Sequence, residues 1–280
     1  MSNLFRHGAG EPLVLVHGFS NVWRVWEPVL PALTARHDVL APTLRGHLGG
    51  EPLPAGAAVT VSALTDGVES AMDAAGFRTA HLCGHSMGGW IALDLARRGR
   101  ARSVVCVAPA GGWTAGSRAA RRLRRRFLVG HRLTALLEPR TRRLVARPGV
   151  RKLLFFDSMV HPERLTPAMA RQRMRATLGC AVYRDLAEAM VRDAPPAWLA
   201  EVDAPVLLAW PQFDRLLPAE GHSESFTEQL RDAQWRDLPG TGHVPMVDDP
   251  DLVARTVLGW VAAHGSARHP SIAGGRSGRQ

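Results

Sequence analysis

Short apolar runs alternate along the chain with longer segments of helical periodicity. Residues 13–17, 38–41, 80–84, 103–108 and 205–210 are short, mostly apolar runs, and glycine or proline bounds several of them. Runs of this kind predict strands that are buried on both faces. Residues 23–34, 62–75, 87–98, 219–231 and 250–264 predict helices. This alternation indicates an α/β fold with a mostly parallel, doubly wound sheet that helices cover on both faces.

The alternation stops after residue 108, and the next predicted strand begins only at residue 205. The sequence between them is rich in arginine and favours helices, and breaker residues at 109–112 and 193–196 mark its ends. We therefore predict a core domain of residues 1–112 and 197–264, interrupted by a helical cap of residues 113–196. Residues 265–280 are rich in Gly, Ser and Arg, which predicts a disordered tail.

The composition narrows the class of protein. A length of 280 residues with 46% hydrophobic content allows a large buried core. No apolar run approaches the roughly 18 residues that a membrane span needs, and the first residues do not follow the pattern of a cleaved signal. Cys83, Cys106 and Cys180 are odd in number and far apart, which fits neither a disulfide framework nor a set of metal ligands. Reduced thiols predict a cytoplasmic protein.

The net charge of +10 comes from one segment. Residues 113–196 hold 19 of the 35 basic residues but 6 of the 25 acidic ones. The densest part of this segment is a cluster of six arginines: Arg118, Arg121, Arg122, Arg124, Arg125 and Arg126. The cluster leaves three roles open: a solvated helix face, contact with an anionic substrate group, and contact with an anionic membrane surface. Nucleic-acid binding is not expected, because the chain has no helix-turn-helix, zinc-finger or RNP pattern.

The strongest chemical signal is a Gly-x-Ser-x-Gly motif at residues 84–88, between a predicted strand and a predicted helix. On such a sharp turn the hydroxyl of Ser86 projects from the sheet edge, and the flanking glycines let neighbouring backbone approach closely. The first amides of the new helix, including that of Met87, point toward charge that develops beside the serine. Ser86 is therefore the candidate nucleophile.

A serine nucleophile needs a base, and the base needs an acceptor that fixes its tautomer. Asp214 follows the predicted strand at 205–210, and His243 lies in a loop before the last predicted helix. The chain order Ser–Asp–His is the one expected of a nucleophile-elbow hydrolase. The amides of Phe19 and Met87 are the candidate donors to the oxyanion. We interpret His17, in the same turn as Phe19, as a structural hydrogen-bonding residue.

Together these motifs resemble the α/β-hydrolase fold family, and specifically its lid-bearing serine hydrolases. The resemblance extends from about residue 12 to residue 264 and includes the turn at 17–19, the elbow at 84–89 and the loops of Asp214 and His243. It implies a triad of Ser86, Asp214 and His243 and no cofactor. The chain departs from the family pattern at Thr43, where an acid is usual. The few residues before the first predicted strand indicate that the antiparallel opening of the sheet is abbreviated or irregular.

The resemblance also implies a reaction class. Family members that resemble haloalkane dehalogenases or epoxide hydrolases use an Asp nucleophile to open alkyl centres, whereas Ser86 implies attack on acyl carbonyls. We expect a hydrolase that cleaves an ester, thioester or related acyl bond of a largely apolar small molecule through an acyl-enzyme. Two alternatives stay open: a carbon–carbon bond hydrolase, and a non-catalytic receptor for a small ligand. Apolar residues at 153–156, 159 and 160 either line the substrate pocket or hold the cap on the sheet. The oligomeric state is not predicted.

Overall fold

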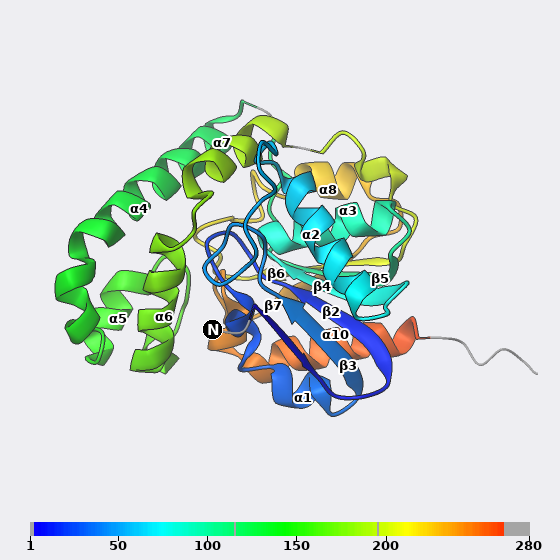
Figure 1. The fold of residues 1–280 in the computed structure, drawn as a ribbon, viewed down its shortest axis with the longest axis horizontal. Helices are drawn as coiled ribbons and strands as arrows, with labels where there is room; N and C mark the ends of the chain where they lie inside the picture. Colours follow the sequence, from blue (N-terminus) through cyan, green and yellow to red (C-terminus); the bar gives the residue numbers. More distant parts are fainter. Residues whose placement is uncertain (1–2, 115, 195, 266–280) are drawn as a thin grey trace, which may run out of the picture.

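A seven-stranded sheet forms the centre of the molecule (Figure 1). The computed structural model describes residues 3–114, 116–194 and 196–265, so nearly all of the predicted tail lies outside the described residues. The strand order is β1-β3-β2-β4-β5-β6-β7. All neighbouring strands are parallel except β1, which pairs antiparallel with β3. The predicted α/β fold with a mostly parallel sheet is therefore confirmed.

Five of the seven strands are the predicted buried runs, with shifts of one or two residues at their ends. They are β2 (Glu11–Val16), β3 (His37–Pro42), β4 (Ala80–His85), β5 (Ala101–Val107) and β6 (Val206–Pro211). The other two, β1 (Leu4–His7) and β7 (Gln234–Leu238), were not predicted. Both are edge strands whose side chains are mostly exposed, so their sequences contain no apolar run.

Helices cover both faces of the sheet, as the alternation predicts. Figure 1 shows α2 (Val61–Ala74), α3 (Met87–Arg97) and α8 (Glu224–Gln229) on one face, and α1 (Leu30–Thr34) and α10 (Pro250–Ala263) on the other. Because successive side chains of a strand point to opposite faces, Val14 and Val16 of β2 pack in the cluster that includes Ile91 of α3. Leu13 and Leu15 pack in the cluster that includes the residues of α10.

Two predicted helices are wrong in extent. The helix expected at 23–34 is a 3-10 turn, η1 (Trp23–Trp26), followed by the short helix α1. Pro28 lies between them, and its missing amide hydrogen removes a helical hydrogen bond. The helix expected at 219–231 is shortened to α8. Gly221 has a φ of 82°, which no right-handed helix contains, so the helix begins only beyond it.

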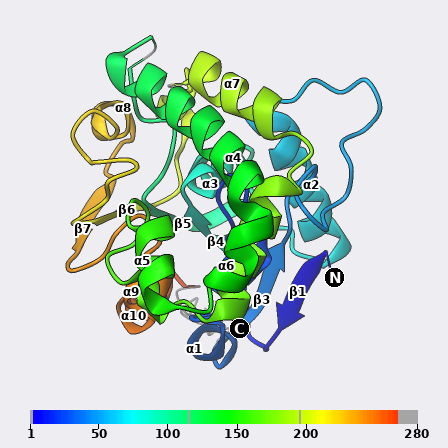
Figure 2. The same ribbon diagram turned by 90° about the vertical axis from the view of Figure 1, so that its left-hand side faces the viewer.

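Residues 113–196, which we call the helical insertion, follow β5 and lie beside the sheet in Figure 1 and in front of it in Figure 2. The insertion contains α4 (Arg118–Leu144), α5 (Pro148–Phe155), η2 (Pro162–Arg164), α6 (Pro167–Leu178) and α7 (Tyr183–Asp193), and η3 (Leu199–Glu201) precedes β6. Helix α4 packs on α6 and α7. The boundaries of the helical insertion as a separate cap domain, residues 113–196, stay predictions. Among the described helices, none combines the length and apolarity that crossing a membrane requires.

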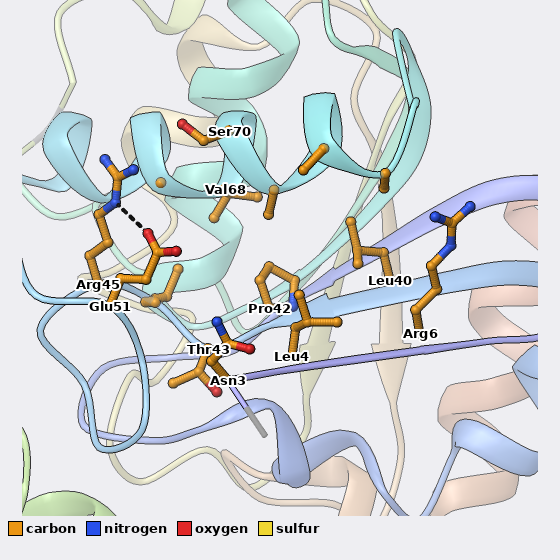
Figure 3. A pocket seen from close by; sticks show the side chains of 15 residues that line it. Asn3, Leu4, Arg6, Leu40, Pro42, Thr43, Arg45, Glu51, Val68 and Ser70 are labelled. Atoms are coloured by element: carbon orange, nitrogen blue, oxygen red, sulfur yellow. Dashed lines mark ion pairs between the residues drawn. The ribbon is translucent and has the colours of Figure 1, made fainter. Parts of the chain in front are cut away.

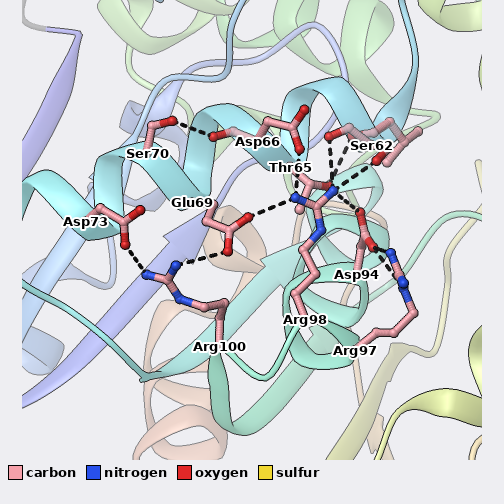
Figure 4. A network of polar contacts seen from close by, with 11 residues as sticks. Ser62, Thr65, Asp66, Glu69, Ser70, Asp73, Asp94, Arg97, Arg98 and Arg100 are labelled. Carbon is pink, nitrogen blue, oxygen red and sulfur yellow. Dashed lines mark hydrogen bonds and ion pairs between the residues drawn. The ribbon is translucent and has the colours of Figure 1, made fainter.

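An arginine network joins α2 to α3 (Figure 4). The guanidinium of Arg98 donates to Asp66 at 2.7 Å and Glu69 at 2.9 Å on α2, and to Asp94 at 3.0 Å on α3. The side chain of Asp94 is 3% exposed, so its buried negative charge needs a positively charged partner such as Arg98. The network holds in place the helix that begins directly after Ser86.

Candidate active site

Ser86 lies at a strained turn between β4 and α3. Its φ of 55° and ψ of −122° are rare for a residue with a side chain, and its amide donates to the carbonyl of Val107 at 2.9 Å. A Cβ on Gly84 would lie 2.0 Å from the carbonyl oxygen of Gly88, and a Cβ on Gly88 would lie 2.1 Å from that of Val16. Only glycine fits at these two positions, which explains the motif around the serine.

Asp214 and His243 form a buried pair. Asp214 follows β6, and His243 lies between β7 and the short helix α9 (Pro245–Asp248). The Nδ1 atom of His243 is 2.7 Å from Oδ2 of Asp214, and both residues are buried. The other carboxylate oxygen of Asp214 accepts the amides of Leu216 at 2.9 Å and Leu217 at 2.7 Å, which fixes the carboxylate. Since an ionised carboxylate only accepts, Nδ1 carries the proton and Nε2 is left as the basic atom.

Ser86 and His243 line one cavity of about 360 Å³ at the end of the sheet where β2, β4, β6 and β7 terminate. The structure thus brings the three predicted triad residues to one edge of the sheet from positions that are distant in the chain. Their catalytic roles stay predictions.

The two candidate oxyanion donors flank Ser86. Phe19 belongs to the turn after β2 and lines the cavity, and Met87 is the first residue of α3. A Cβ on Gly18 would be 2.9 Å from Cβ of Ser86, so this turn lies directly against the nucleophile. Neither the Phe19 nor the Met87 amide donates a hydrogen bond to another of the described residues. Both stay predicted donors for charge beside Ser86.

His17 is a structural residue, as predicted. Its Nε2 accepts the amide of Leu44 at 3.0 Å, which leaves Nδ1 to donate to the carbonyl of Gly18 at 2.8 Å. Burial, assisted by the neighbouring His47, lowers the pKa of His17 to about 3. The neutral ring therefore holds the turn that carries Phe19 against the segment after β3.

Two residues that the sequence analysis did not select hold the His243 loop. His85 donates through Nε2 to the carbonyl of His243 at 2.7 Å. Asp248, 1% exposed, accepts the amides of Gly242 at 2.8 Å, Val160 at 3.0 Å and His161 at 2.7 Å. The carboxylate of Asp248 thus ties the loop of the candidate base to the helical insertion. No short-range pattern marks it, because two of its partners are more than 80 residues away in the chain.

The cavity wall is largely apolar and comes mostly from the insertion. Its apolar and aromatic members are Phe19, Phe127, Leu133, Leu153, Leu154, Phe155, Met174, Tyr183 and Leu216. The two roles considered for the apolar segment at 153–160 are both present. Leu154 and Phe155 line the cavity, whereas Met159 is buried against the Gly242 turn. Phe156 is not among the residues that line the cavity, and its side chain is 55% exposed.

The arginine cluster lies mainly on the outer surface of α4. Five of the six side chains are exposed, and Arg124 pairs with Glu188 of α7. Arg126 differs from the rest, since it is half-buried, lines the cavity and donates to Asp157 at 2.9 Å. The solvated-face interpretation therefore describes most of the cluster but not Arg126.

A second cavity, of about 260 Å³, lies at the sheet edge between β1, β3 and α2 (Figure 3). Its polar wall includes Asn3 and the ion pair of Arg45 with Glu51 at 3.5 Å. None of the triad candidates lines it, so it is separate from the candidate active site. Within the described ranges no three His, Cys, Asp or Glu side chains are grouped so as to hold a metal ion.

Comparison with known proteins identifies the family. Residues 13–256 match the model of the alpha/beta hydrolase family, so the chain belongs to this family and is an enzyme of the hydrolase class. It is 30% identical over 202 residues to epoxide hydrolase EphH of Mycobacterium tuberculosis, covering 71% of this chain and 93% of that one. It is 27% identical to the putative carbamate hydrolase RutD of Azorhizobium caulinodans, covering 91% of this chain and 92% of that one.

The fold is shared with solved structures. An esterase from Thermogutta terrifontis superposes with a TM-score of 0.71 at 24% identity, over 93% of each chain. At this identity the likeness shows the fold alone.

Proposed function

We propose that the protein is a serine hydrolase that cleaves a carboxylic ester, thioester or related acyl bond of a largely apolar small molecule. The observation that carries this proposal is the arrangement at one edge of the sheet. Ser86 stands at a positive-φ elbow and shares a cavity with His243, whose Nδ1 is held by Asp214 at 2.7 Å. A hydroxyl, a base with a fixed tautomer and a buried acceptor are the parts that acyl transfer requires.

The reaction follows from these positions. His243 accepts the hydroxyl proton of Ser86 at Nε2 while the serine oxygen bonds to the acyl carbon. The negative charge on the carbonyl oxygen is stabilised by the amides of Phe19 and Met87. The tetrahedral adduct collapses, the bond to the leaving alcohol or thiol breaks, and the leaving group takes the proton from His243. A water molecule then repeats the sequence on the acyl-enzyme and releases the acid.

The relatives bear on the bond that is cleaved. Epoxide opening by members of this family uses an Asp nucleophile, and position 86 is serine in this chain. A serine alkoxide that attacked an epoxide would leave a stable ether, whereas its acyl ester is readily hydrolysed. This difference supports an acyl substrate for this chain in place of an epoxide.

The proposal is tested with p-nitrophenyl esters of saturated acids from acetate to decanoate, together with acyl thioesters. We expect turnover by the wild-type enzyme and a loss of about 10³-fold or more in kcat/KM in Ser86→Ala. Ser158→Ala is the matched control, because Ser158 is a second serine on the same cavity wall. Wild-type turnover that persists in Ser86→Ala would contradict the mechanism. Turnover of styrene oxide in place of every ester would contradict the substrate class.

Two further predictions are tested by separate experiments. A cytoplasmic location is the expectation from the reduced thiols, and fractionation of cells that produce the protein measures it. Contact of the exposed arginine cluster with an anionic membrane surface is measured by sedimentation with phosphatidylserine vesicles.

A further inference from the structure

One cavity residue carries a charge that nothing in the described structure neutralises directly. Arg173, on α6, lines the cavity together with Ser86 and His243. Its guanidinium lies 5.9 Å from the centre of the Phe155 ring. It makes no ion pair and donates no hydrogen bond to any residue that the structure describes. The guanidinium is half-buried, and its neighbours Phe155 and Met174 offer no oxygen acceptor, so its five N–H donors are available to an anion that enters the cavity.

The acidic residue of the cavity is already engaged. Asp157 is the acidic side chain on this wall, and its Oδ2 accepts from Nη2 of Arg126 at 2.9 Å. The other terminal nitrogen of Arg126 donates to the carbonyl of Arg215 at 2.7 Å. The wall therefore holds two guanidinium groups and one carboxylate, and the excess positive charge belongs to Arg173.

This charge acts close to the nucleophile. Burial is the main reason that the pKa of His85 lies well below its usual value, and the positive charge of Arg173 is among the influences that lower it further. Burial also lowers the pKa of Arg173 itself, against the opposing influence of Asp157. Arg173 and His85, the residue that precedes Ser86, line the same cavity.

We propose that the acyl substrate carries a carboxylate remote from the scissile bond, and that Arg173 binds this carboxylate. The inference rests on the proposed function and adds the substrate class: an ester or thioester with an apolar chain that ends in an acid. A planar guanidinium matches a carboxylate with two parallel hydrogen bonds, and an environment of low polarity strengthens such a pair. The apolar wall of Phe155, Leu154 and Met174 would accommodate the chain between the two ends.

The experiment uses two matched series of p-nitrophenyl esters. One series is the half-esters of adipic, suberic and sebacic acid, and the other is hexanoate, octanoate and decanoate, which lack the terminal acid. Buffer blanks correct for spontaneous hydrolysis. We expect the wild-type kcat/KM to be about 10- to 100-fold higher for the acidic member at the best chain length, the range of a charge-assisted bond. In Arg173→Gln this preference is lost, while the neutral series changes less than about threefold.

Two variants separate charge recognition from a structural role. Arg173→Lys keeps a charge on the same helix and recovers part of the preference for the acidic series. Arg175→Gln removes an exposed arginine from the same helix and keeps the full preference. Loss of activity on both series in Arg173→Gln, with no recovery in Arg173→Lys, would show that Arg173 supports the fold and would overturn the inference.

The outcomes for the two proposals differ. One outcome is that the enzyme hydrolyses the neutral series in a Ser86-dependent way and shows no preference for the acidic series. This result would support the proposed function and would contradict the inference that the substrate carries a carboxylate bound by Arg173. If neither series is hydrolysed, the proposed function fails, and binding of adipate decides the inference. We expect adipate to raise Tm in the wild type and in Arg175→Gln but not in Arg173→Gln. A rise in Tm that is equal in all three proteins would overturn it.

Discussion

Replacement of Asp214 by asparagine tests the relay with little disturbance of the fold. One carboxylate oxygen of Asp214 accepts the amides of Leu216 and Leu217 at 2.9 and 2.7 Å, and the other accepts from His243. In Asp214→Asn the side-chain oxygen is required by the two amides, so the NH₂ group must face Nδ1 of His243. An NH₂ group is a donor, and Nδ1 can then only accept. The proton moves to Nε2, which can no longer take the proton of Ser86.

The expected loss of activity in Asp214→Asn follows from the change in the tautomer of His243. In a serine protease of another fold, the same exchange lowers kcat by about 10⁴-fold, which corresponds to about 5.5 kcal/mol of transition-state stabilisation. We expect a loss of about 10³- to 10⁴-fold in kcat/KM for the best p-nitrophenyl ester. The free energy of unfolding in urea should change by less than about 1 kcal/mol, because the bonds to Leu216 and Leu217 are kept.

Asp214→Ala is the comparison variant, since it removes those backbone bonds as well and should lower both activity and stability. Retention of more than a tenth of the wild-type kcat/KM in Asp214→Asn would refute the reasoning, because His243 would then be acting as a base without its acceptor.

Three further predictions concern the residues that support the site. The pKa of His17 in the folded protein is lowered to about 3, so its contribution to stability is complete above pH 6.5 and is lost as the pH falls toward 3. Protonation of His17 alone should therefore reduce the free energy of unfolding in urea by about 2 kcal/mol between pH 7 and pH 5. Arg98→Ala removes the link from α2 to the buried Asp94 (Figure 4) and should lower the free energy of unfolding by about 2–3 kcal/mol. Asp248→Asn places an NH₂ group against backbone donors and should lower kcat about 10- to 100-fold with little change in KM.

Each of these predictions has a control. His17→Gln should reduce the dependence of stability on pH between 7 and 5, and an unchanged dependence would contradict the assignment to His17. Arg98→Ala should keep kcat/KM within about threefold; a large loss of activity without loss of stability would contradict a structural role. Asp249→Asn alters the neighbouring acid, which caps α10 by accepting the amide of Leu252. If Asp249→Asn lowered kcat as much as Asp248→Asn, the loop contact of Asp248 would not be the cause.

The sequence predicted the parts of the site whose requirements are local. The elbow was visible because the close approach of backbone at Gly84 and Gly88 admits no side chain. The chain order Ser–Asp–His, the place of Asp214 after a predicted strand and the place of His243 in the loop before the last predicted helix indicate the other two residues. The strand that precedes His243 is not predicted. That strand, like β1, is an exposed edge, and apolar runs mark only strands that are buried on both faces.

Residues that act through distant contacts were not predictable. Asp248 joins segments more than 80 residues apart, and nothing in its neighbourhood along the chain distinguishes it from Asp249. Arg173 is one of many basic residues in the insertion, and composition drew attention instead to the cluster on α4. Only the positions of the side chains show that Arg124 is paired outside the cavity while Arg173 faces it.

The nucleophile can be identified by one measurement. The protein is treated with an alkyl fluorophosphonate, and intact mass followed by peptide mapping locates the adduct. We expect a single adduct, on Ser86, which is absent in Ser86→Ala and forms much more slowly in Asp214→Asn. An adduct on another residue, or no adduct on a folded protein that turns over its substrate, would contradict the assignment of Ser86 as the nucleophile.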